Sequence, residues 1–280
     1  MVEENAAGIP ELITTVKDIA KAWWPAPSSE GELWFRGQPE SRYDLVPGLY
    51  RVSNAPFHYS EESLFEEFKS YGAQFVDQRI KTEWDWYFLA QHHRLPTRLL
   101  DWTLNPLAAV YFSLCETFET GDRRNYDAEV RMPVQPSIYD DDSPAVWVLD
   151  AASLNRFAGG PGSDYIITPG GPVSDGYLPS AVLNQSPGNR YPLAVLPPYT
   201  NSRIVAQHGV FTLHGHDNGS IDSLATSSSP ATIRLARIKL DRANLAHTWE
   251  DLELLGIDRG AMFPELDSVV YCIKWYGQNP

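Results

Sequence analysis

The pattern of apolar and polar positions predicts helices in the first part of the chain and a set of short strands further on. Apolar residues three or four positions apart indicate amphipathic helices, and short apolar runs bounded by turn residues indicate strands. Helices are expected over residues 10–24, 60–75, 82–93, 105–114 and 248–255, and in a segment that opens at residue 263. Strands are expected over residues 32–36, 97–103, 145–149 and 233–240, with a strand pair or a bulged strand at 203–216. This order is typical of an α+β fold rather than of regular βαβ alternation.

The chain shows no internal repeat, and its organisation follows from composition. Residues 1–29 are interpreted as an N-terminal helical segment, and residues 30–280 as the main domain. Two polar insertions are expected in that domain, a solvated acidic one near 116–143 and one rich in Gly, Pro and Ser near 158–201. The second is far longer than an ordinary connection, which makes it a candidate lid or binding loop.

The last helix carries an apolar stripe at helical spacing. Its members are Val269, Val270, Ile273 and Trp275. Because an apolar stripe on a helix ordinarily packs on the interior of a protein, we expect these side chains to face the core.

Residues 91–107 concentrate polar side chains between two predicted helices. The stretch holds two histidines, two arginines, an aspartate and a tryptophan. Pro96 stops the helix that precedes it, because its ring cannot continue a helix. Asn105 and Pro106 are typical of an N-cap and a first helical turn. The residues between them, 97–103, are predicted to form a short buried strand, so that charged groups lie near the ends of elements, where a site can be held rigidly.

Composition limits the partners and the compartment. The formal net charge of −14 argues against a protein that grips nucleic acid by its phosphates, so no strong non-specific nucleic-acid binding is expected. A local basic pocket remains compatible with this charge. The sequence has no signal-peptide pattern and no apolar run of the length that spans a membrane, which is about 18 residues. We therefore expect a cytoplasmic protein without a membrane partner.

Cysteine and histidine positions give no sign of a metal. Cys115 and Cys272 each lie in an apolar pattern, as buried free thiols do. His214 and His216 alternate onto one face, but no third ligand follows at a telling spacing, so no metal is expected. The chain also lacks the glycine-rich nucleotide loops, the GxSxG elbow and the HExxH and CxxC motifs.

An arginine at the end of an apolar strand is the first candidate for ligand binding. Arg36 closes the run that begins at Glu32 and is followed by Gly37 and Gln38. A guanidinium in this position can grip a phosphate or carboxylate through two parallel hydrogen bonds, and the glycine allows close approach to the backbone. The alternative is an arginine that pairs with a structural carboxylate.

These residues resemble the FRG domain family, whose name is spelled by Phe35-Arg36-Gly37. Two departures occur, since Arg94 and Ser268 stand where the family usually has glycine. The resemblance spans roughly residues 30 to 270 and rests on the motifs LxPxLxR at 45–51, QHxxxPTRLLDWTxNP at 91–106, VWVL at 146–149, RxxxQxGxFT at 203–212 and FPxLD at 263–267.

A second resemblance, to ADP-ribosyltransferases, indicates a reaction. The strand that ends in Arg36-Gly37 is similar to their first motif, and residues 97–112 look like their strand-to-helix second motif. Residues 203–211 look like the third motif, with Gln207 where a glutamate usually sits. The resemblance implies helices packed around a small split mixed β-sheet, NAD as the substrate, and transfer of ADP-ribose to an unknown macromolecular acceptor.

The same resemblance implies roles for individual residues. Arg36 would hold the diphosphate or adenosine end of NAD, and Trp102 or Tyr50 would stack on nicotinamide. Asp101 would stabilise positive charge on the ribose, with Glu265 as the alternative acid. Gln207 would bond a ribose hydroxyl and His92 would act as a base. Gly37, Gln38, Thr97, Arg98 and Thr103 complete the expected binding set, Arg98 pairing with either Asp101 or a phosphate.

Several other interpretations stay open at the level of the sequence. Arg98, Asp101 and His92 could form one buried structural network. The pocket could belong to a non-catalytic module that binds a nucleotide or a modified peptide. A nuclease with His92 and His93 as acid and base is a third class, which the acidic surface disfavours. If the transferase interpretation holds, a toxin or antiviral effector is the role that the reaction class suggests.

Overall fold

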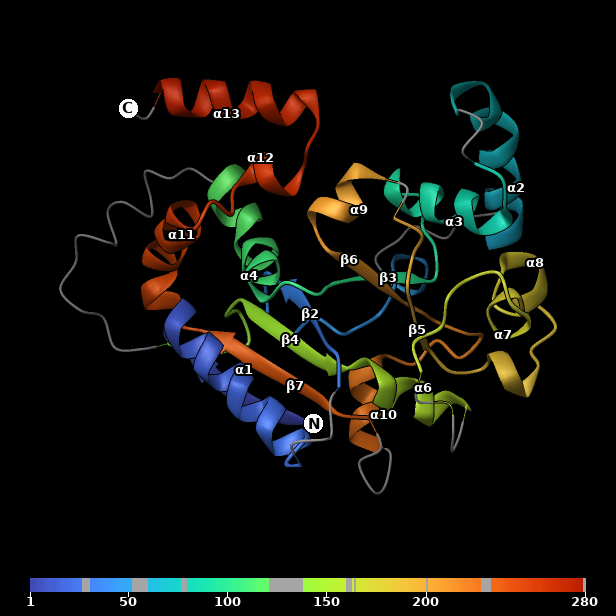
Figure 1. Cartoon of the computed structure of the whole chain (residues 1–280), viewed down its shortest axis with the longest axis horizontal. Helices are drawn as coiled ribbons and strands as arrows, with labels where there is room; N and C mark the ends of the chain where they lie inside the picture. The colour runs from blue at the N-terminus through green and yellow to red at the C-terminus, as the bar shows by residue number, and fades with distance from the viewer. Residues whose placement is uncertain are drawn as a thin grey trace.

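The strands of this chain form one mixed sheet, whose order is β1-β7-β4-β2-β3-β6-β5 (Figure 1). Our computed structural model describes residues 1–26, 31–51, 60–76, 80–120, 138–159, 163, 165–199, 201–227 and 233–278. Among the named strands, β1 and β7 pair in parallel and all other neighbours are antiparallel. The strands are β1 (Val2–Ala6), β2 (Leu33–Gln38), β3 (Leu99–Thr103), β4 (Ala145–Asp150), β5 (Leu193–Val195), β6 (Gly209–Leu213) and β7 (Leu235–Leu240).

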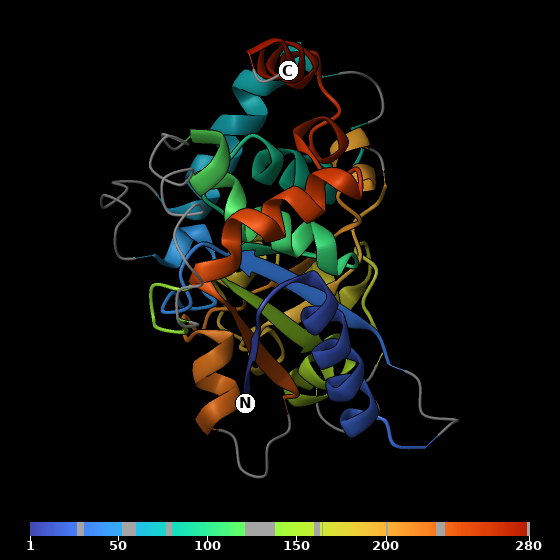
Figure 2. The ribbon, with the colours of Figure 1, turned by 90° about the vertical axis from the view of Figure 1, so that its left-hand side faces the viewer.

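Helices cover both faces of the sheet, which confirms the α+β class (Figures 1 and 2). None of the helices in the described ranges is both long enough and apolar enough to cross a bilayer. The α-helices are α1 (Ile9–Trp23), α2 (Glu61–Gly72), α3 (Glu83–His92), α4 (Pro106–Cys115), α6 (Ala151–Gly159), α7 (Pro172–Asp175), α8 (Pro179–Val182), α9 (Ser202–Ala206), α10 (Ile221–Ser227), α11 (Leu245–Leu254), α12 (Arg259–Met262) and α13 (Leu266–Gln278). Short turns of other helix types are η1 (Gly48–Tyr50), η2 (Ala73–Phe75), η3 (Glu116–Thr120), η4 (Pro187–Asn189) and η5 (Arg242–Asn244).

Three apolar clusters follow from this layering. The first joins α1, α4 and α11 to one face of β4 and β7. The second joins α6 and α10 to the opposite face, around Trp34 and Trp147. The third packs α3 and the start of α2 on β3, β5 and β6, where Phe88 lies on Phe211 with 5.2 Å between ring centroids. The two ends of the sheet are therefore packed by different helices.

β2 and β3 have the fewest paired residues of any neighbouring strands in the sheet. β2 pairs with β4 along its whole length, but it meets β3 at one residue pair only, Phe35 and Thr103. The prediction of a small split sheet is wrong, since seven strands form one continuous sheet. Even so, the strands diverge from this pair, and the candidate site lies where they part. We call this junction the β2–β3 seam.

Several sequence expectations need correction, and each has a local cause. β1 is missing from the expected elements because its residues are mostly polar and exposed, so no alternation marks it as a strand. Residues 203–206 are helical rather than extended, because the Asn201 side chain caps α9 by accepting a hydrogen bond from the Arg203 N–H at 2.8 Å. The expected loop at 158–201 supplies β5 to the sheet edge, a strand too short to show periodicity.

The last helix is oriented opposite to the prediction. Val269, Val270 and Ile273 are exposed, whereas Ser268 is buried. The side chain of Trp275 lies outside the described residues. Helical periodicity identifies an apolar stripe but cannot say which face of the helix meets the body of the protein, and here the polar face does.

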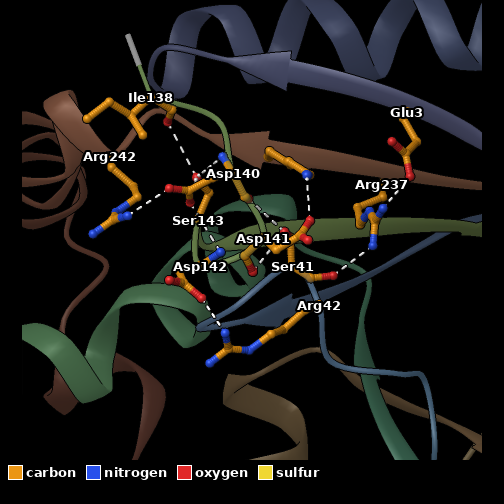
Figure 3. Close-up of polar contacts among 11 residues, drawn as sticks. Glu3, Ser41, Arg42, Ile138, Asp140, Asp141, Asp142, Ser143, Arg237 and Arg242 are labelled. Atoms are coloured by element: carbon orange, nitrogen blue, oxygen red, sulfur yellow. Dashed lines mark hydrogen bonds and ion pairs between the residues drawn. The ribbon is translucent and has the colours of Figure 1, made fainter. Parts of the chain in front are cut away.

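The acidic run before β4 is an ordered turn, although we expected a solvated insertion there (Figure 3). Ser41 donates from its hydroxyl to the main-chain oxygens of Asp140 and Asp141, at 3.0 and 3.2 Å. Residues 121–137 of the expected insertion lie outside the described ranges. Each aspartate of the turn meets its own cation, Arg242 to Asp140 at 2.9 Å, Lys239 to Asp141 at 3.3 Å and Arg42 to Asp142 at 2.5 Å.

This turn holds two parts of the chain together. Ser41 and Arg42 follow the end of β2, so the turn ties the chain just beyond Arg36 to the start of β4. Arg237 on β7 extends the network, because it donates to the Ser41 main-chain oxygen at 2.7 Å and pairs with Glu3 on β1. The acidic run is thus a clamp between strands, and its carboxylates are neutralised by side chains.

Gly37 is required by packing, which gives a first prediction. A Cβ at this position would lie 1.9 Å from the Ala109 main-chain oxygen of α4. We expect Gly37→Ala to lower the free energy of unfolding by about 3 kcal/mol or more, because the clash is with backbone that cannot turn aside. Urea unfolding followed by circular dichroism measures this loss. Gly48→Ala is the matched control, since its added Cβ would meet nothing within 4 Å, and equal losses in both variants would contradict the packing role.

Candidate functional site

A cavity of about 1400 Å³ opens at the β2–β3 seam, between the end of α3 and the end of α9. Strand ends supply most of its floor, and η1 and α9 supply its sides. The predicted site residues line it except Arg98 and the alternative acid Glu265, namely Arg36, Gly37, Gln38, Tyr50, His92, Thr97, Asp101, Trp102, Thr103 and Gln207. The sequence predictions therefore converge on one cavity, although the contacts divide these residues into structural and available groups.

Arg36 bridges the seam. Its Nη1 donates to the main-chain oxygen of Asp101 at 2.6 Å, where a ladder hydrogen bond would lie in a regular sheet. Its Nε is buried and has no hydrogen-bond partner. Burial lowers the pKa of Arg36 to about 10, against the opposing effect of Asp101, and Arg51 lowers it further. A charged, partly dehydrated guanidinium with a spare donor is well suited to bind an anion.

The carboxylate of Asp101 is exposed in the cavity and held in position by two side chains. Gln91 donates from Nε2 to Asp101 Oδ2 at 2.9 Å, and Thr97 donates from its hydroxyl to Gln91 Oε1 at 2.6 Å. The threonine thereby fixes the amide orientation of Gln91. The sequence analysis gave Gln91 no role, because its function depends on a partner ten positions away in a different element.

Arg98 is a structural residue, and its expected pairing with Asp101 is wrong. Its side chain is buried, and Nε donates to Glu61 Oε2 of α2 at 2.6 Å. Nη1 donates to the main-chain oxygen of His214 at 2.6 Å, and Nη2 donates to that of Tyr177. Each nitrogen of the guanidinium thus has a protein partner, and Arg98 does not line the cavity, so it is not placed to bind a phosphate there. The single network of Arg98, Asp101 and His92, which the sequence left open as an alternative, is likewise absent from these contacts.

Other predicted binding residues also have structural partners. Trp102 is buried in the core and donates from Nε1 to the Thr212 hydroxyl at 3.0 Å, so its ring is not free to stack on a ligand. Gln38 accepts from Trp147 Nε1 at 2.6 Å. Thr103 donates to the main-chain oxygen of Gln207 at 2.6 Å, which joins the end of β3 to the end of α9.

Tyr50 is the aromatic residue that remains available. It is half-buried on the cavity wall, and its hydroxyl donates to the Gly215 main-chain oxygen at 2.6 Å. Burial raises the pKa of this hydroxyl to about 12, so the group stays protonated at neutral pH. The ring is held at its far end and edge-on to His214, which suits it to present one surface to a planar group.

His92 and Gln207 lie on the other side of the cavity. Burial and the charge of Arg203 lower the pKa of His92 below its usual value, with His93 adding to the effect and Glu265 opposing it. Its imidazole is therefore neutral at pH 7 and able to accept a proton. Gln207 donates from Nε2 to the Met262 main-chain oxygen at 3.0 Å. His93 is exposed and does not line the cavity.

The structure adds arginines that the sequence analysis did not assign. Arg51, Arg94 and Arg203 line the cavity with Arg36, against the acids Asp44, Asp101 and Glu116. The cavity is thus locally basic within a chain of net charge −14. Arg203 packs over the Phe263 ring at 4.4 Å, and burial lowers its pKa. No spacing in the sequence links these arginines, because they lie far apart in the chain, after η1, after α3 and in α9.

Two further sequence observations find an explanation. Arg94 has φ of 65°, a left-handed conformation that favours glycine, which is the residue the motif usually has there. His214 is fully buried, and burial lowers its pKa to about 3, so it is a neutral core residue. Within the described ranges, no group of three or more His, Cys, Asp or Glu residues could hold a metal ion.

Comparison with known proteins identifies a domain within the chain. The model of the FRG domain matches residues 31–122, from just before β2 to just after η3. The chain therefore carries an FRG domain, and this range contains both strands of the seam and the residues Arg36, Gln91 and Asp101. The motifs at 146–149, 203–212 and 263–267 lie beyond the matched range. No curated protein and no solved structure matches the chain.

The buried Arg98–Glu61 pair gives a second prediction. Glu61→Gln leaves the Arg98 charge buried without its counter-ion, so we expect the free energy of unfolding to fall by about 3–5 kcal/mol. Chemical denaturation at pH 7 provides the measurement. Glu67→Gln on the exposed side of the same helix should change it by less than about 0.5 kcal/mol. A loss of the same size in Glu67→Gln would show that charge on α2, rather than this pair, is responsible.

Proposed function

We propose that this FRG-domain protein is an NAD-dependent ADP-ribosyltransferase whose site is the cavity at the β2–β3 seam. The observation that carries the proposal is Arg36, which is charged, bridges two strands and keeps a buried donor without a partner. A diphosphate offers the acceptors that such a guanidinium needs. The ADP-ribosyltransferase resemblance, with its arginine-glycine first motif at Arg36 and Gly37, supplies the reaction.

The reaction breaks the bond between nicotinamide and ribose through a transition state with positive charge on the ribose. Asp101 is the carboxylate in the cavity that is best placed for this charge, because Gln91 and Thr97 fix it beside Arg36. A preoriented charge of this kind needs no reorganisation during the reaction. Tyr50 takes the role of stacking on nicotinamide, since Trp102 is engaged in the core.

The missing glutamate of the third motif is the main chemical difference from the resembled family. Gln207 can accept a hydrogen bond from a ribose hydroxyl through Oε1, but it carries no charge. In this proposal Asp101 supplies the charge and His92, neutral at pH 7, receives the proton of an acceptor hydroxyl or amine. Glu265 acts through its electrostatic effect on His92 and Arg203.

The principal alternative is a binding module that uses the same cavity without turnover. Such a module would bind its ligand through the same residues, but it would release no nicotinamide from NAD. The nuclease alternative is less well supported, because His93 lies outside the cavity and its ring meets that of His92 edge-on at 4.9 Å. A role as a toxin or antiviral effector follows from the reaction class alone and belongs to the same proposal.

Release of nicotinamide tests the proposal. The purified protein is incubated with NAD, with and without cell lysate as a source of acceptors, and free nicotinamide is measured by chromatography. We expect release by the wild type and a loss of about 100-fold or more in Arg36→Ala and in Asp101→Asn, as for removal of a charge-stabilising group. Arg42→Ala and Asp142→Asn, which remove an exposed ion pair beyond the end of β2, should stay within about twofold.

The pattern of the variants separates the two functions. No release by the wild type under either condition would contradict the transferase and leave the binding module. Equal release by the wild type and Arg36→Ala would contradict the assigned site. Folding of each variant is checked by thermal unfolding, so that loss of activity is not mistaken for loss of structure.

A further inference from the structure

Helix α13 has its apolar face turned away from the protein. Val269, Val270 and Ile273 are 51%, 49% and 67% exposed, and Leu266, in the first turn, is 83% exposed. The opposite side meets the body through Ser268, which is only 2% exposed. Figures 1 and 2 show α13 as an outer layer beyond α12. Residues four and three positions apart form a continuous stripe, so the exposed residues constitute one surface.

We propose that this stripe, formed by Leu266, Val269, Val270 and Ile273, pairs antiparallel with the same stripe of a second copy of this chain. An exposed apolar stripe on a helix is the usual sign of a helix partner. A two-fold axis that passes between Val269 and Val270 brings Leu266 opposite Ile273 and Val269 opposite Val270. The stripe is therefore complementary to itself, as an isologous interface requires.

Charge favours this occupant and its direction. Asp267 and Lys274 are both exposed and lie seven positions apart, so they flank the stripe on the same side. In the antiparallel pair, Asp267 of one copy lies on the same side of the interface as Lys274 of the other, two residues from the position directly opposite, within reach of the long lysine side chain, and the contact occurs twice. A parallel pair would instead place these charges of the two copies on opposite sides of the interface, where they would not meet.

The same charges disfavour other partners. An interfacial membrane helix carries several basic residues on its polar flank, whereas the described side chains of α13 carry one acid and one base. A net charge of −14 further opposes an anionic lipid surface. A nucleic acid would meet the same repulsion.

Exposed leucines also follow the point where α11 meets α13. Glu253 at the end of α11 lines a small cavity with Tyr271 and Cys272 of α13, so the two helices are adjacent there. The next residues, Leu254 and Leu255, are 86% and 54% exposed. An interface built on one stripe of four side chains lies at the small end of specific contacts, so we expect a reversible dimer at micromolar concentration.

Sedimentation velocity over a concentration series tests the proposal with the full chain. The wild type should approach twice the monomer mass of 31.5 kDa as its concentration rises through the micromolar range. Val270→Glu should weaken dimerisation at least tenfold. Val173→Glu on α7 is the matched control, since Val173 is also a valine with 49% exposure, and it should leave the dimer unchanged.

A charge exchange tests the antiparallel direction. Asp267→Lys places two lysines at each contact and Lys274→Asp places two aspartates there, so each variant alone should be monomeric. An equimolar mixture should restore a dimer, because every contact then joins opposite charges. The direct observable is co-sedimentation of the two variants when one carries a fluorescent label.

Three results would overturn the proposal. One is a wild type that stays monomeric at high micromolar concentration. Another is a wild-type dimer that Val270→Glu weakens no more than Val173→Glu does, which would assign dimerisation to another surface. The third is a mixture of the charge variants that stays monomeric. Circular dichroism of each variant confirms that α13 and the rest of the fold persist, and the result is independent of any reaction in the cavity.

Discussion

The hydrogen bond from Arg36 to the main-chain oxygen of Asp101 is the contact on which the site depends. It lies where β2 and β3 stop pairing, so a side chain takes the place of the strand ladder. This replacement of a backbone hydrogen bond by a side-chain hydrogen bond has two consequences. The strands part and leave a cavity, and a charged guanidinium becomes fixed at its floor with a donor to spare. A long, regular β2–β3 pairing would close the seam and remove both features.

Three supporting networks make this arrangement rigid. Beneath it, Arg98 joins Glu61 and two main-chain oxygens, so β3 is anchored to α2 and to the residues after β6. Behind it, the acidic turn at 140–143 clamps the chain that leaves β2. Beside it, Thr97 and Gln91 orient the carboxylate of Asp101. The motif that names the family thus combines residues that build the seam with a few that stay available to a ligand.

The sequence predicted the longer helices and most of the residues that were proposed for the site and line the cavity, but it did not predict which of these residues have structural partners. Helical periodicity and caps located α1, α3 and α4 within a residue or two, because these signals are local. Gln91 could not be assigned and Arg98 was assigned wrongly, since their partners are set by tertiary packing rather than by spacing. β1 and β5 were missed because an edge strand that is polar or very short carries no alternation. The stripe on α13 was identified correctly, but the periodicity of a helix does not say which of its faces packs on the body of the protein.

Equilibrium binding of NAD, measured by titration calorimetry, examines the ligand site at the β2–β3 seam without requiring turnover. We predict that the wild type binds NAD, that Arg36→Lys weakens binding because a single ammonium cannot reproduce the planar fork, and that added salt weakens it further. Replacement of Arg98 is expected to act on stability and not on the affinity of the folded protein. The account would be contradicted if the wild type failed to bind NAD, or if Arg36→Lys bound it as tightly as the wild type does.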